Sequence, residues 1–153
     1  CAIADEMIDR LKPDTYYLVG PGSTTRTLMD ELGLLDTLIG VDLICNRELV
    51  QSDLSEADIL KRLDEKPTHL IVTPTGGQGY LLGRGNQQLS AKVLRRIGKE
   101  NLHVLATKEK LFHLRGRALL VDTGDAEVDK MLCGYVRVIV DYQEEQMCRI
   151  GTE

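Results

Sequence analysis

The sequence has 153 residues, of which 42% are hydrophobic and 28% charged, which is the composition of one globular domain rather than of a disordered chain. A net charge of −5 and an aromatic content of 4% argue against a nucleic-acid-binding surface, which needs clustered Lys and Arg or aromatic stacking platforms. No apolar run approaches the roughly 20 residues of a membrane span.

The cysteines and the first residues bear on location and domain organisation. The chain has four cysteines: Cys1, Cys45, Cys133 and Cys148. None belongs to a CxxC pair or has a histidine at zinc-ligand spacing, so we expect reduced thiols that pack as small hydrophobic side chains, no metal site and a cytoplasmic location.

Residues 2–11 already form an amphipathic helical pattern. We therefore expect residues 1–153 to be a single α/β domain, excised as the C-terminal part of a larger protein.

Apolar periodicity predicts that strands and helices alternate along the chain after this first helix. The predicted strands cover residues 16–19, 38–44, 70–72, 102–106 and 118–121, and the predicted helices cover residues 23–32, 55–63, 90–97, 107–114 and 125–132. Residues 73–89 predict a long loop, and residues 135–140 and 146–150 predict an antiparallel hairpin. Because the strands are continuously apolar, they favour an α/β fold: a three-layer, Rossmann-like sandwich with a mostly parallel sheet and this C-terminal hairpin.

A glycine-rich turn follows the first predicted strand and is the first candidate site. Its candidate ligand-binding residues are Gly20, Gly22, Ser23, Thr24, Thr25 and Arg26. Backbone N–H groups at a helix N-terminus attract an anion, and hydroxyl groups and a guanidinium can donate to a phosphate. The alternative is an ordinary turn with Ser/Thr capping. The turn matches neither the GxGxxG fingerprint nor a P-loop. Asp42 lies about 20 residues further on, the position at which an acidic residue binds a ribose hydroxyl in dinucleotide-binding folds. The alternative is that Asp42 is an ordinary turn residue.

The second candidate site is the long loop after the strand at residues 70–72. Its candidate ligand-binding residues are Thr75, Gly76, Gly77, Gln78, Gly79, Arg84, Gly85, Asn86 and Gln87. Several glycines in a short stretch allow a ligand to approach the backbone closely, and ligands of open α/β sheets bind at the carboxyl ends of strands. A loop of this length is usually functional or disordered, and Tyr80-Leu81-Leu82 would anchor this one. We expect the two loops to converge on one crevice.

The third candidate is a pair of carboxylates, Asp122 and Asp125, at the end of another predicted strand. They are suited to acid/base work or to Mg²⁺, and the alternative is a turn with Asp125 as a helix N-cap. The three histidines, His69, His103 and His113, are isolated in the sequence, and we expect structural roles for them. No catalytic residue follows from spacing alone.

Two resemblances rest on these segments. The turn VGPGSTT at residues 19–25 resembles the phosphate-binding turn of the ribose phosphate isomerase, glucosamine phosphate deaminase and CoA-transferase fold group. A longer resemblance covers nearly the whole chain: the segments YYLVGPGSTTRTLMDELGL, HLIVTPTGGQGYLLGRGNQQLS and LLVDTGDAEVD resemble the C-terminal portion of the ATP–NAD kinase-like family. That resemblance implies a parent protein that phosphorylates NAD with ATP or polyphosphate, with ATP or NAD and Mg²⁺ as its ligands.

The chain departs from that family in one respect. The diagnostic GGDGT motif of NAD kinases is absent, and the amide of Gln78 in Gly76–Gly79 cannot act as a base. We therefore expect this domain alone to be inactive and to need a missing N-terminal domain. The leading hypothesis is a C-terminal domain that binds a nucleotide or phosphorylated ligand. The alternatives are a non-catalytic sugar-phosphate-binding regulatory module and a sugar-phosphate isomerase or deaminase. The terminal hairpin would pack on the N-terminal domain or on a second copy of the chain.

Overall fold

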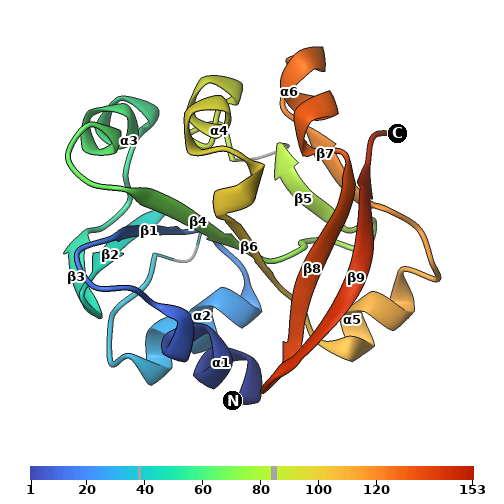
Figure 1. Cartoon of the computed structure of the whole chain (residues 1–153), viewed down its shortest axis with the longest axis horizontal. Helices are drawn as coiled ribbons and strands as arrows, with labels where there is room; N and C mark the ends of the chain where they lie inside the picture. The colour runs from blue at the N-terminus through green and yellow to red at the C-terminus, as the bar shows by residue number, and fades with distance from the viewer. Residues whose placement is uncertain (38, 84–85) are drawn as a thin grey trace.

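The computed structural model describes residues 1–37, 39–83 and 86–153, and it places one mixed sheet between two layers of helices (Figure 1). The strands are β1 (Tyr16–Val19), β2 (Asp42–Cys45), β3 (Glu48–Gln51), β4 (Thr68–Val72), β5 (Tyr80–Gly83), β6 (Leu102–Leu105), β7 (Leu119–Asp122), β8 (Gly134–Asp141) and β9 (Glu144–Gly151). The helices are α1 (Ala2–Arg10), α2 (Ser23–Glu31), α3 (Glu56–Leu63), α4 (Ala91–Ile97), α5 (Lys108–His113) and α6 (Ala126–Leu132), with a 3₁₀ turn at Lys99–Asn101. In Figure 1, α3, α4 and α6 lie on one side of the sheet, and α1 and α2 lie on the other.

The nine strands lie in the order β3-β2-β1-β4-β6-β8-β9-β7-β5. Strands β1, β4, β6 and β8 are parallel to one another, and the hairpin β2–β3 adds antiparallel strands at one edge. The long hairpin β8–β9 then reverses the direction, so that β9, β7 and β5 run opposite to β1 and β4. The α/β sandwich, the mostly parallel sheet and the C-terminal hairpin are thus confirmed.

Two strand predictions were wrong. Leu38, the first residue of the predicted strand at residues 38–44, lies outside the described residues; residues 39–41 are not in a strand, β2 begins at Asp42, and a second strand, β3, follows it closely. The predicted loop at residues 73–89 contains β5. The two missed strands lie at the two edges of the sheet: β3 is only partly buried, and β5 follows a glycine-rich segment and ends in a glycine. Neither has the continuous apolar run that marks a buried strand, so pairing with neighbours decides their conformation.

The core consists of two layers of buried side chains, one on each side of the sheet. Strand β1 shows why its sequence is continuously apolar, because all four of its residues are buried. Tyr16 and Leu18 pack on the side of α3 and α4, whereas Tyr17 and Val19 pack on the side of α1 and α2. A strand that is covered on both faces needs apolar residues at every position.

Side-chain caps begin most of the helices, and α2 is the exception that matters for the site. Ser55, Ser90, Thr107 and Asp125 each accept a hydrogen bond from a backbone N–H group in the first turn of the helix that follows. Gly22 precedes α2, and no side chain among the described residues caps this helix there. The N–H groups in the first turn of α2 therefore have no capping side chain.

Two histidines form a stacked pair inside the sheet. His69 Nδ1 and His103 Nε2 are 2.8 Å apart, and their rings stack with centroids 5.0 Å apart. The ring of Tyr17 lies beside both. Burial lowers the pKa of His103 to about 4, and the neighbouring His69 and two basic side chains act in the same direction. Burial also lowers the pKa of His69.

We expect the free energy of unfolding to fall as the pH is lowered. The unfolded chain takes up a proton at position 103 near pH 6.5, whereas folded His103 resists protonation down to about pH 4. A depressed histidine pKa of this size lowers stability by about 2 kcal/mol between about pH 7.5 and about pH 5, and His69 adds to the loss. Urea unfolding at both pH values measures it. His103→Gln should reduce this pH dependence, whereas His113→Gln, at an exposed position, should not. An equal pH dependence of the free energy of unfolding in the two variants would contradict the assignment of this effect to His103.

Candidate functional site

The turn at residues 20–26 meets the loop that follows β4. Strands β1 and β4 are parallel neighbours, so both end at the same edge of the sheet. The Gly20 N–H donates to Ile71 O at 2.9 Å, which continues the pairing by one residue. Gly22 then lies directly against Thr73, because a Cβ atom at position 22 would overlap the Thr73 methyl group. The φ angle of Gly22 is 141°, which also favours glycine.

The first turn of α2 presents polar groups outward from this edge. Ser23 is exposed and Thr24 is half-buried. Thr25 is buried, and its hydroxyl donates to Gly22 O at 3.1 Å, so this threonine holds the turn rather than facing solvent. The Arg26 side chain is about half exposed, and its Nε lies 3.6 Å from Asp36 Oδ2. An exposed pair at that distance contributes little stability, so the guanidinium can turn toward an anion at small cost.

Asp42 lies beside this turn, but its carboxylate already has partners. The residue pairs with Val19 at the end of β1 and is 2% exposed. Its oxygens accept hydrogen bonds from Thr37 N at 2.9 Å, from Thr37 Oγ1 at 2.7 Å and from Asp53 N at 2.9 Å. These three bonds tie the segment before β2 to the segment after β3. A ribose hydroxyl would have to share a carboxylate that organises two loops.

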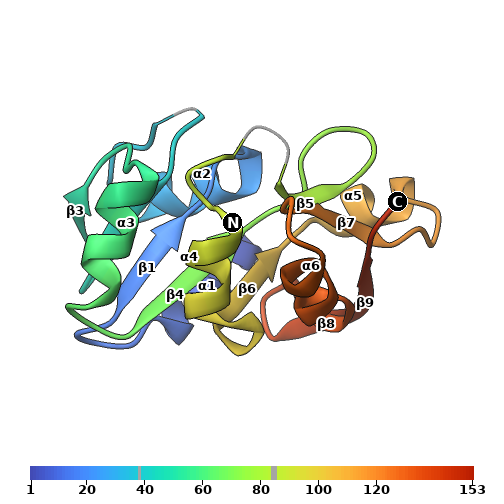
Figure 2. The same cartoon turned by 90° about the horizontal axis from the view of Figure 1, so that it is seen from above.

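The loop after Thr73 turns away from α2. Thr75 N donates to Tyr80 O at 2.9 Å and closes a small exposed loop over residues 75–80. Lys110 Nζ of α5 donates to Gly76 O at 2.7 Å, and a Cβ atom at Gly79 would lie 2.7 Å from Leu114. In Figure 2 this loop projects beside α5. The predicted residues from Thr75 to Gly79 thus lie against α5.

The end of the predicted loop returns toward α3. Gln87 lies with Asp53 and Ser55 around a hollow of about 480 Å³ at the start of that helix. Asn86 closes a turn by accepting a hydrogen bond from Leu89 N at 3.1 Å. The remaining predicted ligands of this segment, Arg84 and Gly85, lie outside the described residues.

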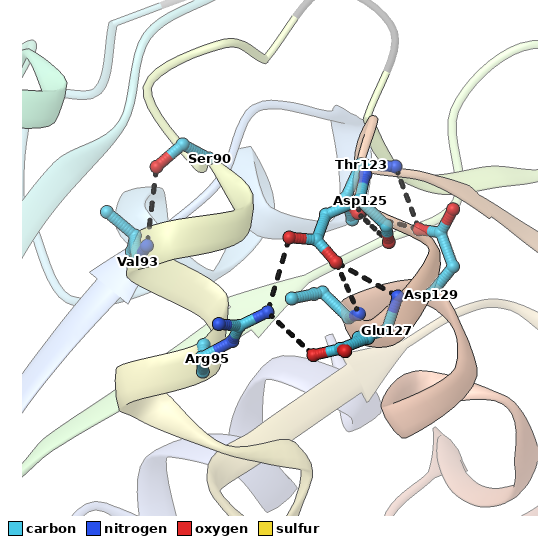
Figure 3. A network of polar contacts seen from close by, with 8 residues as sticks. Ser90, Val93, Arg95, Thr123, Asp125, Glu127 and Asp129 are labelled. Atoms are coloured by element: carbon cyan, nitrogen blue, oxygen red, sulfur yellow. Dashed lines mark hydrogen bonds and ion pairs between the residues drawn. The ribbon is translucent and has the colours of Figure 1, made fainter.

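The two carboxylates of the third candidate have different surroundings. Asp122 is the exposed last residue of β7. Asp125 caps α6: its carboxylate accepts from two backbone N–H groups of that helix and lies 3.2 Å from Arg95 (Figure 3). Nearby, Thr123 donates through its backbone N–H and its hydroxyl to Asp129, at 2.9 and 2.7 Å. Nowhere in residues 1–37, 39–83 and 86–153 does a group of three or more His, Cys, Asp or Glu side chains form a potential metal site.

The structure therefore divides the predicted residues into separate groups. It brings the turn at residues 20–26 together with Thr73 and places Asp42 beside them. It puts residues 75–79 against α5 and Gln87 against α3. Asp122 lies at the end of β7 and Asp125 at the start of α6, in the half of the sheet whose strands run opposite to β1. Sequence reasoning named no role for Lys110, because its approach to Gly76 depends on the packing of α5.

The close approach of Gly22 and Thr73 makes a clear stability prediction. Gly22→Ala should lower the free energy of unfolding by about 3 kcal/mol, through steric overlap and a disfavoured φ angle. Gly77→Ala is the matched control, since Gly77 has open space around it and an ordinary φ, and should change stability by less than about 0.5 kcal/mol. Adding Thr73→Ser to Gly22→Ala removes the overlapping methyl group and should restore part of the loss. Chemical denaturation measures all three; similar values for Gly22→Ala and Gly77→Ala would contradict the close approach.

Asp42→Asn tests whether the carboxylate is structural. One asparagine position would become an NH₂ group facing an N–H donor, so the free energy of unfolding should fall by about 2 kcal/mol without any ligand. Asp30→Asn, at an exposed position on α2, should leave stability unchanged. Equal stability of Asp42→Asn and the unmodified protein would show instead that the carboxylate is available to a ligand.

Comparison with known proteins gives the family. No helix in the described part of the chain is long and apolar enough to cross a membrane. No curated protein and no solved structure matches the chain. The family model for the ATP-NAD kinase C-terminal domain, however, matches residues 13–150, which include both glycine-rich segments and the terminal hairpin. The chain therefore belongs to the ATP-NAD kinase C-terminal domain family.

Proposed function

We propose that this chain is the ligand-binding C-terminal domain of an ATP- or polyphosphate-dependent NAD kinase-like protein, and that its turn at residues 20–26 holds a phosphate of the nucleotide. The observation that carries the proposal is the start of α2, where Gly22 supplies no capping side chain and lies tightly against Thr73. Family membership supports the kinase-like parent.

The physical chemistry of the turn favours an anion. The N–H groups in the first turn of a helix lack partners within the helix, and the helix dipole makes that end positive. Glycine at position 22 has no side chain that could occupy these N–H groups, while Ser23 and Thr24 add hydroxyl donors. Arg26 is one turn further on and adds a positive charge that is only weakly held by Asp36. A phosphate group matches this combination of donors and charge.

The later glycine-rich segments would contact the rest of the ligand. Thr73 joins them to the turn, and the exposed residues 75–78 lie toward α5, so they would contact only a part of the ligand that extends away from α2. Gln87 approaches from the side of α3, and Asn86 precedes it in the chain. We propose that Arg84 and Gly85 complete this set of donors. A nucleotide is long enough to reach beyond one strand end, whereas a sugar phosphate would use the turn alone.

Phosphoryl transfer would need groups that the described residues do not supply. Transfer requires metal-held phosphates and a positioned nucleophile. The described residues contain no group of side chains suited to a metal ion, and the Asp125 carboxylate is used as a helix cap and by Arg95. These residues do not fit Mg²⁺, so no step through Mg²⁺ is assigned to this domain. We propose that an N-terminal domain of the parent protein supplies the base and the metal ligands.

A thermal-shift screen tests the proposal. NAD, NADP, ATP and polyphosphate are added to the chain, with ribose phosphate and glucosamine phosphate as comparison ligands. A nucleotide at about 100 times its Kd should add roughly 2.7 kcal/mol of stability, which raises Tm by about 8 °C in a domain of this size. Arg26→Ala should reduce the nucleotide shift. Arg137→Ala is the control, because it removes an exposed arginine on β8, away from the turn.

The alternatives predict other results of the same screen. A shift with sugar phosphates but not with nucleotides would favour the regulatory module, and turnover of a sugar phosphate would favour the isomerase or deaminase. A nucleotide shift that is unchanged in Arg26→Ala would contradict binding at the turn.

A further inference from the structure

A pocket of about 300 Å³ opens at the other end of β1 from the glycine-rich turn. It lies where β1 begins and β2 ends, since Tyr16 pairs with Cys45, whereas Gly20 follows the opposite end of β1. Leu11 and Pro13 give this pocket its accessible apolar lining, and the almost fully buried Tyr17 and Ile44 lie behind them. Its volume is that of a site for a small organic ligand.

Two cations border this apolar space. Lys12 and Arg47 both line the pocket, and both are exposed. Among the ion pairs between described residues, neither takes part in one, although the chain as a whole is acidic. The Arg47 guanidinium makes one long contact, 3.5 Å to Ile8 O. Two cations without a partner carboxylate, beside a concave apolar surface, are arranged to receive an anion that also has an apolar part.

The backbone at the pocket is held in an unusual conformation. Asn46 and Arg47 form the two-residue turn between β2 and β3, with φ angles of 52° and 64°. Hairpin turns of this kind favour Asn followed by Gly, so an arginine at the second position is conformationally unfavourable. Asp14, also with a positive φ angle of 52°, donates its N–H to Asn46 Oδ1 at 2.9 Å. Backbone strain of this kind is concentrated at functional sites, where the side chain has a use that glycine could not serve.

We propose that this pocket binds a small organic anion, consisting of a flat apolar ring with one phosphate or carboxylate group. The ring lies against Leu11 and Pro13, and the anionic group lies between Lys12 and Arg47. The site is separate from the turn at residues 20–26, because the two lie at opposite ends of β1, and it does not depend on the function proposed for that turn.

Phenyl phosphate and benzoate are suitable probes, with uncharged benzyl alcohol as the comparison. Each is titrated into the isotope-labelled chain, and binding is followed by the backbone amide NMR signals of Tyr17, Asn46 and Arg47. Arg47→Gly is the decisive variant, since it removes the cation and installs the favoured Asn-Gly turn, so its Tm should be equal or higher. Its Kd for the anionic probe should rise at least about tenfold, the effect expected when one charge-assisted contact is lost.

Arg115→Gly is the matched control, because it also replaces an arginine at a positive φ angle, of 54°, but just after α5. It should leave the affinity unchanged, and Lys12→Gln should weaken binding. The inference is overturned if neither anionic probe shifts these amides, if benzyl alcohol binds as well as the anions do, if Arg47→Gly retains the affinity, or if Arg115→Gly loses it equally.

Discussion

The antiparallel pairing of β8 with β9 in the middle of the sheet decides which parts of this protein can meet. Up to β8 the central strands are parallel, and the loops after β1 and β4 leave from one edge. Beyond β9 the strands run the other way, so β7 and β5 end at the opposite edge. The parallel pairing of β1 with β4 brings Gly22 against Thr73, whereas the reversal carries Asp122 and Asp125 away from them. A fully parallel sheet would have gathered all three candidate loops at a single crevice.

Local signals in the sequence were enough for the helices and for most of the buried strands, although the start of β2 was predicted too early. Ser55, Ser90, Thr107 and Asp125 each precede an amphipathic pattern, and a cap depends only on the few residues that follow it. Strands β3 and β5 were missed because neither has the continuous apolar run that marks a buried strand. The antiparallel turn from β8 to β9 was predicted, but the pairing of β7 and β5 beyond β9 was not, since these partners are far apart in the sequence.

The residue types of the candidate site could be predicted from the sequence, but their arrangement in space could be predicted only in part. The turn at residues 20–26 could be recognised from its glycines and hydroxyl residues, but the role of Thr73 depends on the pairing of β1 with β4. The bonds of Asp42 with Thr37 and Asp53 join segments on both sides of a hairpin, which no spacing reveals. The one local feature of the sequence that points to the pocket beside Lys12 is the pair Asn46-Arg47. This pair can be recognised as a hairpin turn only if β3 is known to follow it.

The position of β9 also has a consequence for how the protein is made. Strand β9 separates β8 from β7 in the sheet, yet residues 144–151 follow every other strand in the chain. During synthesis, β5 and β7 therefore cannot join the rest of the sheet until β9 has been translated. For β5 the wait is about 70 residues, or several seconds at the usual ~5–20 residues per second. Over that time the ribosome-bound chain exposes unpaired strand edges, which makes it a natural client for chaperones that act on nascent polypeptides.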